Sequence, residues 1–318
     1  MMQFKPVFIV GHPRSGSTLL AARLGQHSKL HSTPETHYFD LSYSGNLFQR
    51  WLACRNRERF ERFVTAGNPR LEDLKISIDE IKEISRRQFP AFDSVLRVIM
   101  DREAALNGKE RCVEKTPRHL EHVPLIIKWF PGAKIIAIIR DGRDAIRSLL
   151  NVSWTHNDLG RHAAHWSSNV AQCVEFAKRY PENFKLIRYE QLLIEPEATL
   201  RGVCEFIGED FEQQMLSGTS TDAVIPEWEK NWKGNSGAAI DPALAQTWRR
   251  ASDQKVIQEI AARIQKELTL AGYIDPGESA ISVKRTSALR HAALRLRHDV
   301  NAIVKRNFVR RVAHRGVR

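Results

Sequence analysis

Short apolar runs alternate with longer amphipathic segments along the chain. Three of these runs have the composition of strands buried on both faces, at residues 7–10, 134–139 and 184–189. A fourth candidate strand, at 111–115, is more polar. Segments with a helical spacing of apolar residues follow the three runs, at 18–24, 144–150 and 197–207. This alternation is typical of a parallel sheet that helices cover on both faces. We therefore predict an α/β fold built on a parallel sheet.

Two segments depart from this alternation. Between about Asn46 and Asn107 the pattern is helical and polar, which predicts a helical insertion over one edge of the sheet. A cluster of residues that break regular structure, Asp275 to Ser279, divides the chain into a domain at 1–275 and a tail at 276–318. In the tail, apolar residues recur at three- and four-residue steps among arginines, so we expect a basic amphipathic helical tail.

Composition adds that the protein is of an ordinary globular kind, with 42% hydrophobic and 27% charged residues among 318. The four cysteines lie far apart and form no CxxC pair, which argues against a zinc site or a disulfide framework and indicates a reducing compartment. Neither an apolar run of transmembrane length nor a signal-peptide pattern occurs. We expect a cytoplasmic protein that could still lie at a membrane periphery.

The net charge of +12 belongs largely to the tail. From residue 281 to the end, eleven Lys or Arg residues stand against the single acid Asp299. Because the rest of the chain is nearly neutral, we expect no nucleic-acid partner. The tail at 281–318 fits an anionic membrane surface, the steering of an acidic acceptor, or a solvated arm.

The most informative motif follows the first apolar run and reads Gly11-His12-Pro13-Arg14-Ser15-Gly16-Ser17-Thr18. A loop of this kind between a strand and a helix wraps its backbone N–H groups around a phosphate. Its spacing matches GxxxxGK[ST] except that Ser17 replaces the lysine, so the fold is expected to be P-loop-like. That lysine contacts the β- and γ-phosphates in kinases and ATPases, and its absence argues against both.

Residues 10–19 resemble the 5′-phosphosulfate loop of sulfotransferases that use 3′-phosphoadenosine 5′-phosphosulfate (PAPS), including tyrosylprotein, bacterial and carbohydrate sulfotransferases. The resemblance implies that PAPS is the donor co-substrate and that no metal is required. It also implies which residues bind the 5′-phosphosulfate, namely Arg14, Ser15, Gly16, Ser17 and Thr18.

A second anion site is indicated at the end of the run at 134–139. Arg140 stands where ligands bind in open parallel sheets, and Ser148 lies about two helical turns further on. The alternative is a structural pairing of Arg140 with Asp141 or Asp144. The sulfotransferase 3′-phosphate site has an arginine and a serine at this same spacing, so the resemblance implies that Arg140 and Ser148 bind the 3′-phosphate.

Sulfuryl transfer needs a base for the acceptor and a positive charge for the leaving oxygen. The resemblance implies Glu35 as the base and Lys115 as the leaving-group stabiliser, with Arg14 as the third catalytic residue. His37 is a second candidate base, although a lone histidine beside aromatic residues is more often packed. We expect Glu114 to orient Lys115 or the acceptor.

The remaining matches are weaker. Arg188-Tyr189-Glu190-Gln191-Leu192 resembles a family segment in which Tyr189 would contact the nucleotide or simply pack. The segment at 228–250, with Trp228, Trp232, Lys233, Ser236, Trp248 and Arg249, resembles a loop that closes over the nucleotide. The acceptor stays open between a glycan, a protein tyrosine and a lipid. A small-molecule kinase and a nucleotide-binding protein without turnover are the alternative functions, and the missing lysine and the absence of an acidic Walker-B-like strand end weigh against the kinase.

Overall fold

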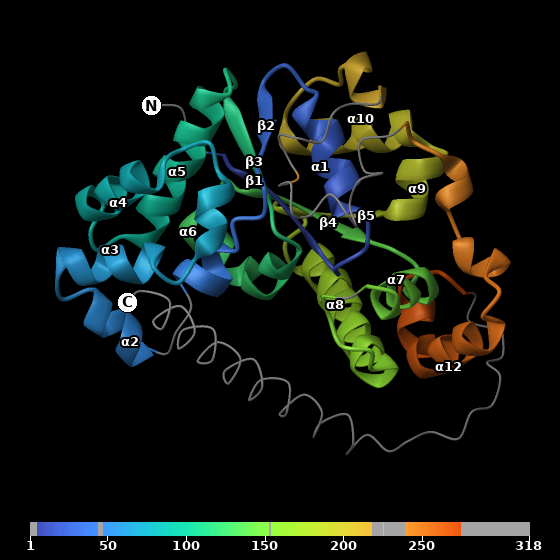
Figure 1. Cartoon of the computed structure of the whole chain (residues 1–318). Coiled ribbons are helices and arrows are strands. Elements are labelled where there is room, and N and C mark those ends of the chain that lie inside the picture. The colour runs from blue at the N-terminus through green and yellow to red at the C-terminus, as the bar shows by residue number, and fades with distance from the viewer. Residues whose placement is uncertain (1–4, 44–46, 153, 218–224, 226–238, 275–318) are drawn as a thin grey trace.

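The computed structural model describes residues 5–43, 47–152, 154–217, 225 and 239–274, which are coloured in Figure 1. The predicted tail at 276–318 lies outside the described residues, and so do Trp228, Trp232, Lys233 and Ser236.

Five parallel strands form one sheet, in the order β2-β3-β1-β4-β5. Their bounds are Val7–Gly11 for β1, Leu30–Ser32 for β2, Arg111–Lys115 for β3, Lys134–Ile139 for β4 and Phe184–Arg188 for β5. The predicted α/β parallel sheet is confirmed. The sequence pattern did not predict β2, and it extended β5 by one residue, because Tyr189 already begins the next helix.

The strands alternate their side chains between two apolar clusters, one on each face of the sheet. In β1, Val7 and Ile9 belong to one cluster, and Phe8 and Val10 belong to the other. Each of these four side chains is fully buried. Burial on both faces explains why the central strands are continuously apolar instead of alternating with polar residues.

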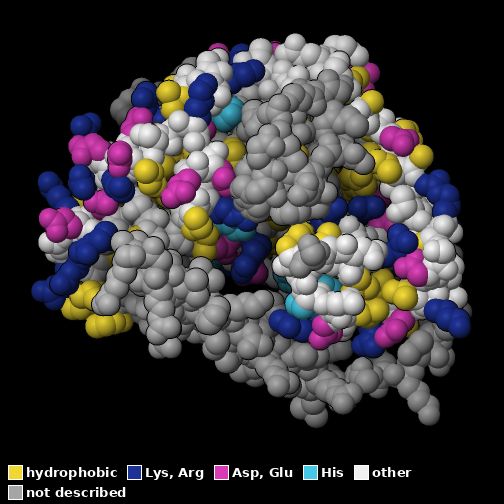
Figure 2. Space-filling view, in the orientation of Figure 1, with side chains coloured by type: hydrophobic (Ala, Val, Ile, Leu, Met, Phe, Trp, Pro, Cys, Tyr) yellow, Lys and Arg dark blue, Asp and Glu magenta, His cyan; other side chains and the backbone are white. Residues whose placement is uncertain are grey.

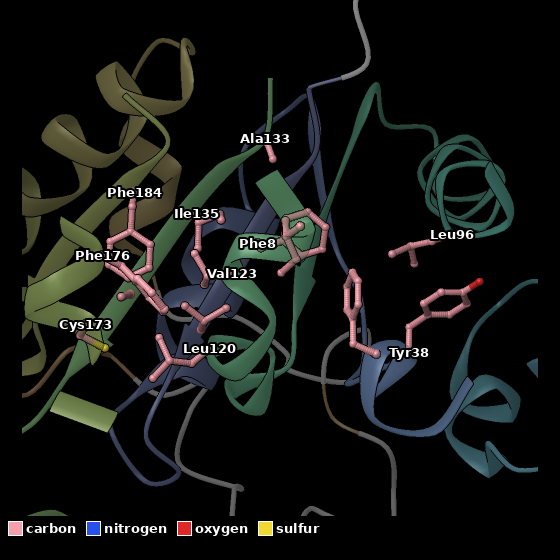
Figure 3. Close-up of a cluster of buried hydrophobic side chains, with 14 of the residues drawn as sticks. Phe8, Tyr38, Leu96, Leu120, Val123, Ala133, Ile135, Cys173, Phe176 and Phe184 are labelled. Carbon is pink, nitrogen blue, oxygen red and sulfur yellow. The ribbon is translucent and has the colours of Figure 1, made fainter. Parts of the chain in front are cut away.

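Three helices and a short 3₁₀ turn cover the face with Val7 and Ile9 (Figure 1). They are α1 (Ser17–Gly25), α9 (Tyr189–Ile194), α10 (Pro196–Ile207) and the turn Gln213–Leu216. The other face packs against most of the remaining helices, and Figure 3 shows Phe8 and Ile135 of the sheet in one cluster with Leu120, Val123 and Phe176.

The described residues between β2 and β3 form helices and turns but no strand, which agrees with the helical pattern between Asn46 and Asn107. After a π-helical turn (Tyr38–Ser42) come α2 (Leu47–Ala53), α3 (Arg57–Thr65), the turn Pro69–Asp73, α4 (Ile78–Arg87) and α5 (Phe92–Leu106). Side chains cap two of these helices: Asn56 accepts from the first turn of α3, and Ser77 accepts from that of α4. The group lies beside the β2–β3 edge of the sheet (Figure 1).

Further helices and turns follow β3, β4 and β5 (Figure 1). They are the turn Pro117–His122, α6 (Val123–Trp129), α7 (Gly142–Leu150), α8 (Leu159–Arg179), the turns Pro242–Leu244 and Thr247–Arg250, and α12 (Gln254–Leu270). Ile260, Ile264 and Leu268 of α12 are buried in the same cluster as Phe8. Among the described helices, none combines the length and the apolar composition that crossing a bilayer requires.

Candidate functional site

All five strands end at one edge of the sheet, and each carries a candidate site residue or loop to that edge. Read in the spatial order of the strands, these are Glu35 after β2, Lys115 at the end of β3, the phosphate loop after β1, Arg140 after β4 and Tyr189 after β5. Because ligands of open parallel sheets bind at the carboxyl ends of the strands, one ligand could meet residues from all five.

The phosphate loop depends on backbone conformations that favour glycine. Gly16 has φ +90° and ends the loop, and Arg14 within it has φ +67°. A Cβ atom added at Gly16 would lie 2.2 Å from the Tyr189 Cδ2 atom, so the ring of Tyr189 packs where a side chain would otherwise stand. Within the described chain no side chain caps α1, and its first turn contains no acid. The N–H groups of that turn are therefore suited to an anion.

Two arginines meet beside this loop. Arg14 Nε donates to Ser148 Oγ at 3.0 Å, and Arg140 Nη1 donates to the carbonyl oxygen of Arg14 at 3.4 Å. The Arg140 guanidinium lies 4.7 Å from the centroid of the Tyr189 ring. Burial lowers the pKa of Arg14, and the charge of Arg140 lowers it further. Two like charges held together at a helix N-terminus repel each other, and an anion between them would relieve that repulsion.

The acids near Arg140 leave part of its guanidinium for a ligand. Asp141 pairs with Arg143 instead, at 2.7 Å, and Asp144 Oδ2 stays 3.8 Å from Arg140 Nη2. Arg140 Nε and the buried Ser15 Oγ have no hydrogen-bond partner among the described residues. Buried polar atoms are rarely left without partners. The phosphates of the expected donor fit this site, since their oxygens would accept from both atoms.

At the other end of the edge, Lys115 and Glu35 form an ion pair. Lys115 Nζ donates to Glu35 Oε1 at 2.8 Å, with the lysine side chain fully buried and that of Glu35 only 13% exposed. Lys115 lies opposite Ile9 in the sheet register, and Ile9 stands two residues before Gly11, where the phosphate loop begins. The expected base and the expected leaving-group stabiliser therefore contact each other beside the strand that leads into the phosphate loop.

Glu114 forms hydrogen bonds with residues other than Lys115. It accepts hydrogen bonds from Thr36 Oγ1 at 2.7 Å, Thr116 Oγ1 at 2.6 Å and His119 Nδ1 at 2.8 Å. Burial opposes its charge, but the interactions with His119 and the two threonines lower the pKa of Glu114 below its ordinary value. This buried carboxylate fastens the segment that contains Glu35 to the end of β3.

His37 is bound between two acids and is not a simple packed histidine. Its Nε2 lies 3.1 Å from Glu35 Oε2, and its Nδ1 lies 3.4 Å from Asp40 Oδ2. Burial opposes protonation, yet the hydrogen bonds to Asp40 and Glu35 raise the pKa of His37 to about 8. Asp40 also contacts His122 at 3.4 Å. Burial opposes the charge of Asp40, but its bonds to His122 and His37 lower its pKa.

Near Arg140, Asp144 anchors the described end of the 228–250 segment. Its Oδ1 accepts from Thr247 Oγ1 at 2.6 Å and from the Trp248 N–H at 2.7 Å. Arg143 lies 3.7 Å from the centroid of the Trp248 ring. This segment thus contacts the helix that follows Arg140.

Sequence reasoning missed Asp40, His122 and Thr247, and it considered Asp144 only as a partner of Arg140. One of them had a local signal: Asp40 stands three residues after His37, the spacing of neighbours on a helical turn. The partners of the others lie 82 and 103 positions away in the chain, so no local pattern could have joined them.

Residues 6–213 match the model of the sulfotransferase family. The chain belongs to the sulfotransferase family. Among its sulfotransferase relatives, protein-tyrosine sulfotransferase A of Caenorhabditis elegans is 26% identical over 220 residues, covering 66% of this chain and 51% of the relative. Protein-tyrosine sulfotransferase 1 of Danio rerio is 26% identical over 219 residues, covering 66% of this chain and 55% of the relative. The chain thus spans about half the length of these curated relatives.

Among solved structures of sulfotransferases, the sulfotransferase domain from the Synechococcus PCC 7002 olefin synthase aligns with a TM-score of 0.58. It is 24% identical to this chain, and the alignment covers 85% of this chain and 97% of that domain. This likeness supports the fold independently of the family match.

Proposed function

We propose that the chain is a PAPS-dependent sulfotransferase that moves a sulfuryl group to an acceptor hydroxyl. The observation that carries the proposal is the sequence of groups along the sheet edge: a carboxylate, a buried lysine, a phosphate loop and a second arginine. This arrangement offers a base, a cation for a leaving oxygen and two anion sites, which is what transfer from a nucleotide with phosphates at both the 5′ and 3′ positions requires.

The donor half would be bound from β1 and β4. The N–H groups of the first turn of α1, the hydroxyls of Ser15, Ser17 and Thr18, and Arg14 would hold the 5′-phosphosulfate. Arg140 and Ser148 would hold the 3′-phosphate, and Tyr189 would pack against the nucleotide. When bound, the donor supplies the sulfuryl group. The contact between Arg14 and Ser148 supports a single continuous pocket for both phosphates.

The transfer itself would use Glu35 and Lys115. Glu35 would accept the proton of the acceptor hydroxyl as its oxygen bonds to sulfur. Lys115 would stabilise the negative charge on the bridging oxygen as the bond from sulfur to that oxygen breaks, leaving adenosine 3′,5′-bisphosphate. His37 is the weaker candidate base because, with a pKa of about 8, it already carries a proton at neutral pH. It would instead hold Glu35 in place.

The donor assignment can be tested by isothermal titration with three nucleotides. We expect adenosine 3′,5′-bisphosphate to bind without magnesium and more tightly than either ATP or adenosine 5′-monophosphate. Arg140→Ala should weaken the bisphosphate by roughly tenfold to a hundredfold, the scale of a charge-assisted hydrogen bond, and leave the monophosphate almost unaffected. The control is Arg201→Ala, which removes an exposed arginine paired with Glu197.

A magnesium-dependent preference for ATP would contradict the proposal and support a kinase. Bisphosphate binding without transfer of label from PAPS to any acceptor would support a binding protein instead. Peptide, glycan and lipid fractions should be offered separately with labelled PAPS, so that the fraction that takes up label names the acceptor class.

A further inference from the structure

The helix α2 carries an apolar surface that the candidate site does not use. Leu47, Phe48, Trp51 and Leu52 are 78%, 65%, 54% and 37% exposed, and we call these four residues the α2 surface. They make up half of the large hydrophobic side chains that are exposed in the described part of the chain. Phe48 and Trp51 stack on each other with ring centroids 5.7 Å apart. Contiguous exposed apolar side chains of this kind mark interaction surfaces.

The segment that carries the α2 surface is rich in arginine. The segment from α2 to the end of α3 contains Arg50, Arg55, Arg57, Arg59 and Arg62. Its two acids are Glu58 and Glu61, and Glu61 is buried and paired with Arg86 at 2.7 Å. Figure 2 shows hydrophobic and Lys or Arg side chains side by side at this corner of the molecule. The exposed charge here is therefore strongly positive.

We propose that the α2 surface docks on an anionic lipid membrane. Trp and Phe side chains favour the boundary between headgroups and acyl chains, and arginines around them would contact lipid phosphates. Arg50 and Arg55 already lie over aromatic rings, 4.6 Å from the Tyr43 centroid and 4.9 Å from the Trp51 centroid. Apolar insertion and charge attraction would thus act at the same place, which is how short interfacial helices bind.

Charge argues against the two other occupants of this surface. The apolar stripe of the tail at 281–318 is accompanied by eleven Lys or Arg residues and one acid, so the arginines around α2 would repel it. A second copy packed through the same surface would bring two sets of these arginines together, because a twofold interface places identical patches face to face. An anionic bilayer attracts both the tail and the α2 surface.

Vesicle cosedimentation of the full chain would test the proposal. We expect binding to vesicles of phosphatidylcholine and phosphatidylglycerol, and little binding to phosphatidylcholine alone. Phe48→Ser/Trp51→Ser should weaken binding to the anionic vesicles by at least about tenfold, since two large apolar side chains are lost from the contact. The matched control is Ile194→Ser/Leu270→Ser, which removes apolar side chains that are 59% and 45% exposed elsewhere and should bind like the unaltered chain.

A second measurement locates the contact. Vesicles with brominated acyl chains should quench part of the tryptophan fluorescence of the unaltered chain, and Trp51→Phe should remove that quenchable part. Equal vesicle binding by the Phe48/Trp51 variant and the unaltered chain would overturn the proposal. A loss of self-association in that variant, without any change in vesicle binding, would overturn it in favour of a dimer interface.

Discussion

Glu35 has both carboxylate oxygens engaged, one by Lys115 and the other by His37. Two cationic donors hold the side chain in one orientation at the carboxyl edge of the sheet, where a hydroxyl could approach it. Lys115 lies 80 positions from Glu35 in the chain and His37 only two. The buried Glu114 accepts a hydrogen bond from the backbone N–H of Thr36, between Glu35 and His37. The chemistry proposed for this group therefore depends on contacts between β2, β3 and the turn that follows each.

Replacing this carboxylate with an amide should remove the base and preserve the shape. For Glu35→Gln we expect turnover with PAPS to fall by about a hundredfold or more, the usual contribution of a general base, with unchanged affinity for adenosine 3′,5′-bisphosphate. Steady-state kinetics and calorimetry would measure the two quantities. Glu58→Gln, at an exposed position, serves as the control. Full turnover in Glu35→Gln would move the base assignment to His37.

His37 should make the stability of the protein depend on pH. Its pKa in the folded chain is about 8, above the ordinary 6.5, so its contribution is complete below pH 6.5 and is lost as the pH rises through 8. The shift corresponds to about 2 kcal/mol of unfolding free energy. Urea unfolding at pH 6 and pH 9 should therefore show a smaller loss for His37→Gln than for the unaltered chain.

Asp40→Asn removes one of the two acids that raise this pKa and should also reduce the loss between the two pH values. If His37→Gln and the unaltered chain lose the same free energy, the two acids do not hold a proton on His37.

Residue identities near the site could be read from local patterns, but their partners could not. The loop from Gly11 to Thr18 has a spacing that few structures other than a phosphate site produce. By contrast, the contact between Arg14 and Ser148 joins positions 134 apart, and the contact between Glu114 and Thr36 joins positions 78 apart. The local sequence predicts which chemical group is present at a position, whereas the order of the strands determines which residues that group contacts.

At the scale of elements, the turn from β1 into α1 is the most constrained part of the site. Gly16 combines a positive φ with the ring of Tyr189 at the place of its absent Cβ atom. Tyr189, the first residue of α9, therefore restricts which residue can end the phosphate loop. Tyr189 would serve the site in this way whether or not it contacts a nucleotide.

A substitution at Gly16 should lower the free energy of unfolding by more than backbone strain alone would. Gly108 has φ +65° with open space around its Cβ position, so Gly108→Ala should cost only the left-handed strain of about 1–2 kcal/mol. Gly16→Ala adds a clash with Tyr189, and we expect a larger loss of unfolding free energy together with the loss of nucleotide binding. Urea unfolding of both variants gives the comparison. Equal costs would mean that the Tyr189 ring moves aside freely.

The elements themselves were largely predictable, with one instructive exception. β1 and β4 are apolar throughout because both of their faces are buried, and this made them visible in the sequence. β2 has three residues, Leu30 to Ser32, of which two are polar. It exists because its backbone pairs with β3 at the edge of the sheet, a tertiary contact that leaves no periodic pattern in so short a segment.

At the scale of the whole molecule, Asp144 connects the C-terminal part of the chain to the donor side of the site. It lies in α7, four residues after Arg140, and accepts hydrogen bonds from Thr247 and Trp248. The same carboxylate therefore stands between the second arginine and the segment that the sequence predicts to close over the nucleotide. Asp144 therefore links the position of that segment to the charge beside the proposed 3′-phosphate site.

Removing the Asp144 carboxylate should increase the mobility of the segment around Thr247 and Trp248. For Asp144→Ala we expect amide hydrogen exchange at Trp248 to accelerate by roughly tenfold to a hundredfold, since a hydrogen bond to a charged acceptor is lost. Mass spectrometry of peptides that cover 244–251 would detect this. Asp253→Ala, which breaks the contact with Arg147 at 2.8 Å but not the two bonds to Asp144, should leave Trp248 protected. Unchanged exchange in Asp144→Ala would exclude the anchor.

The order of the strands also separates two kinds of chemistry. Glu35 and Lys115 come from β2 and β3, whereas the phosphate loop and Arg140 come from β1 and β4. The α2–α5 helices are inserted between β2 and β3 alone. In the proposed mechanism, a change in the α2–α5 helices would alter the side of the site that carries Glu35 and Lys115. The phosphate loop and Arg140, which would bind the nucleotide, come from other strands and would stay the same. Evolution could therefore change the acceptor without changing the donor.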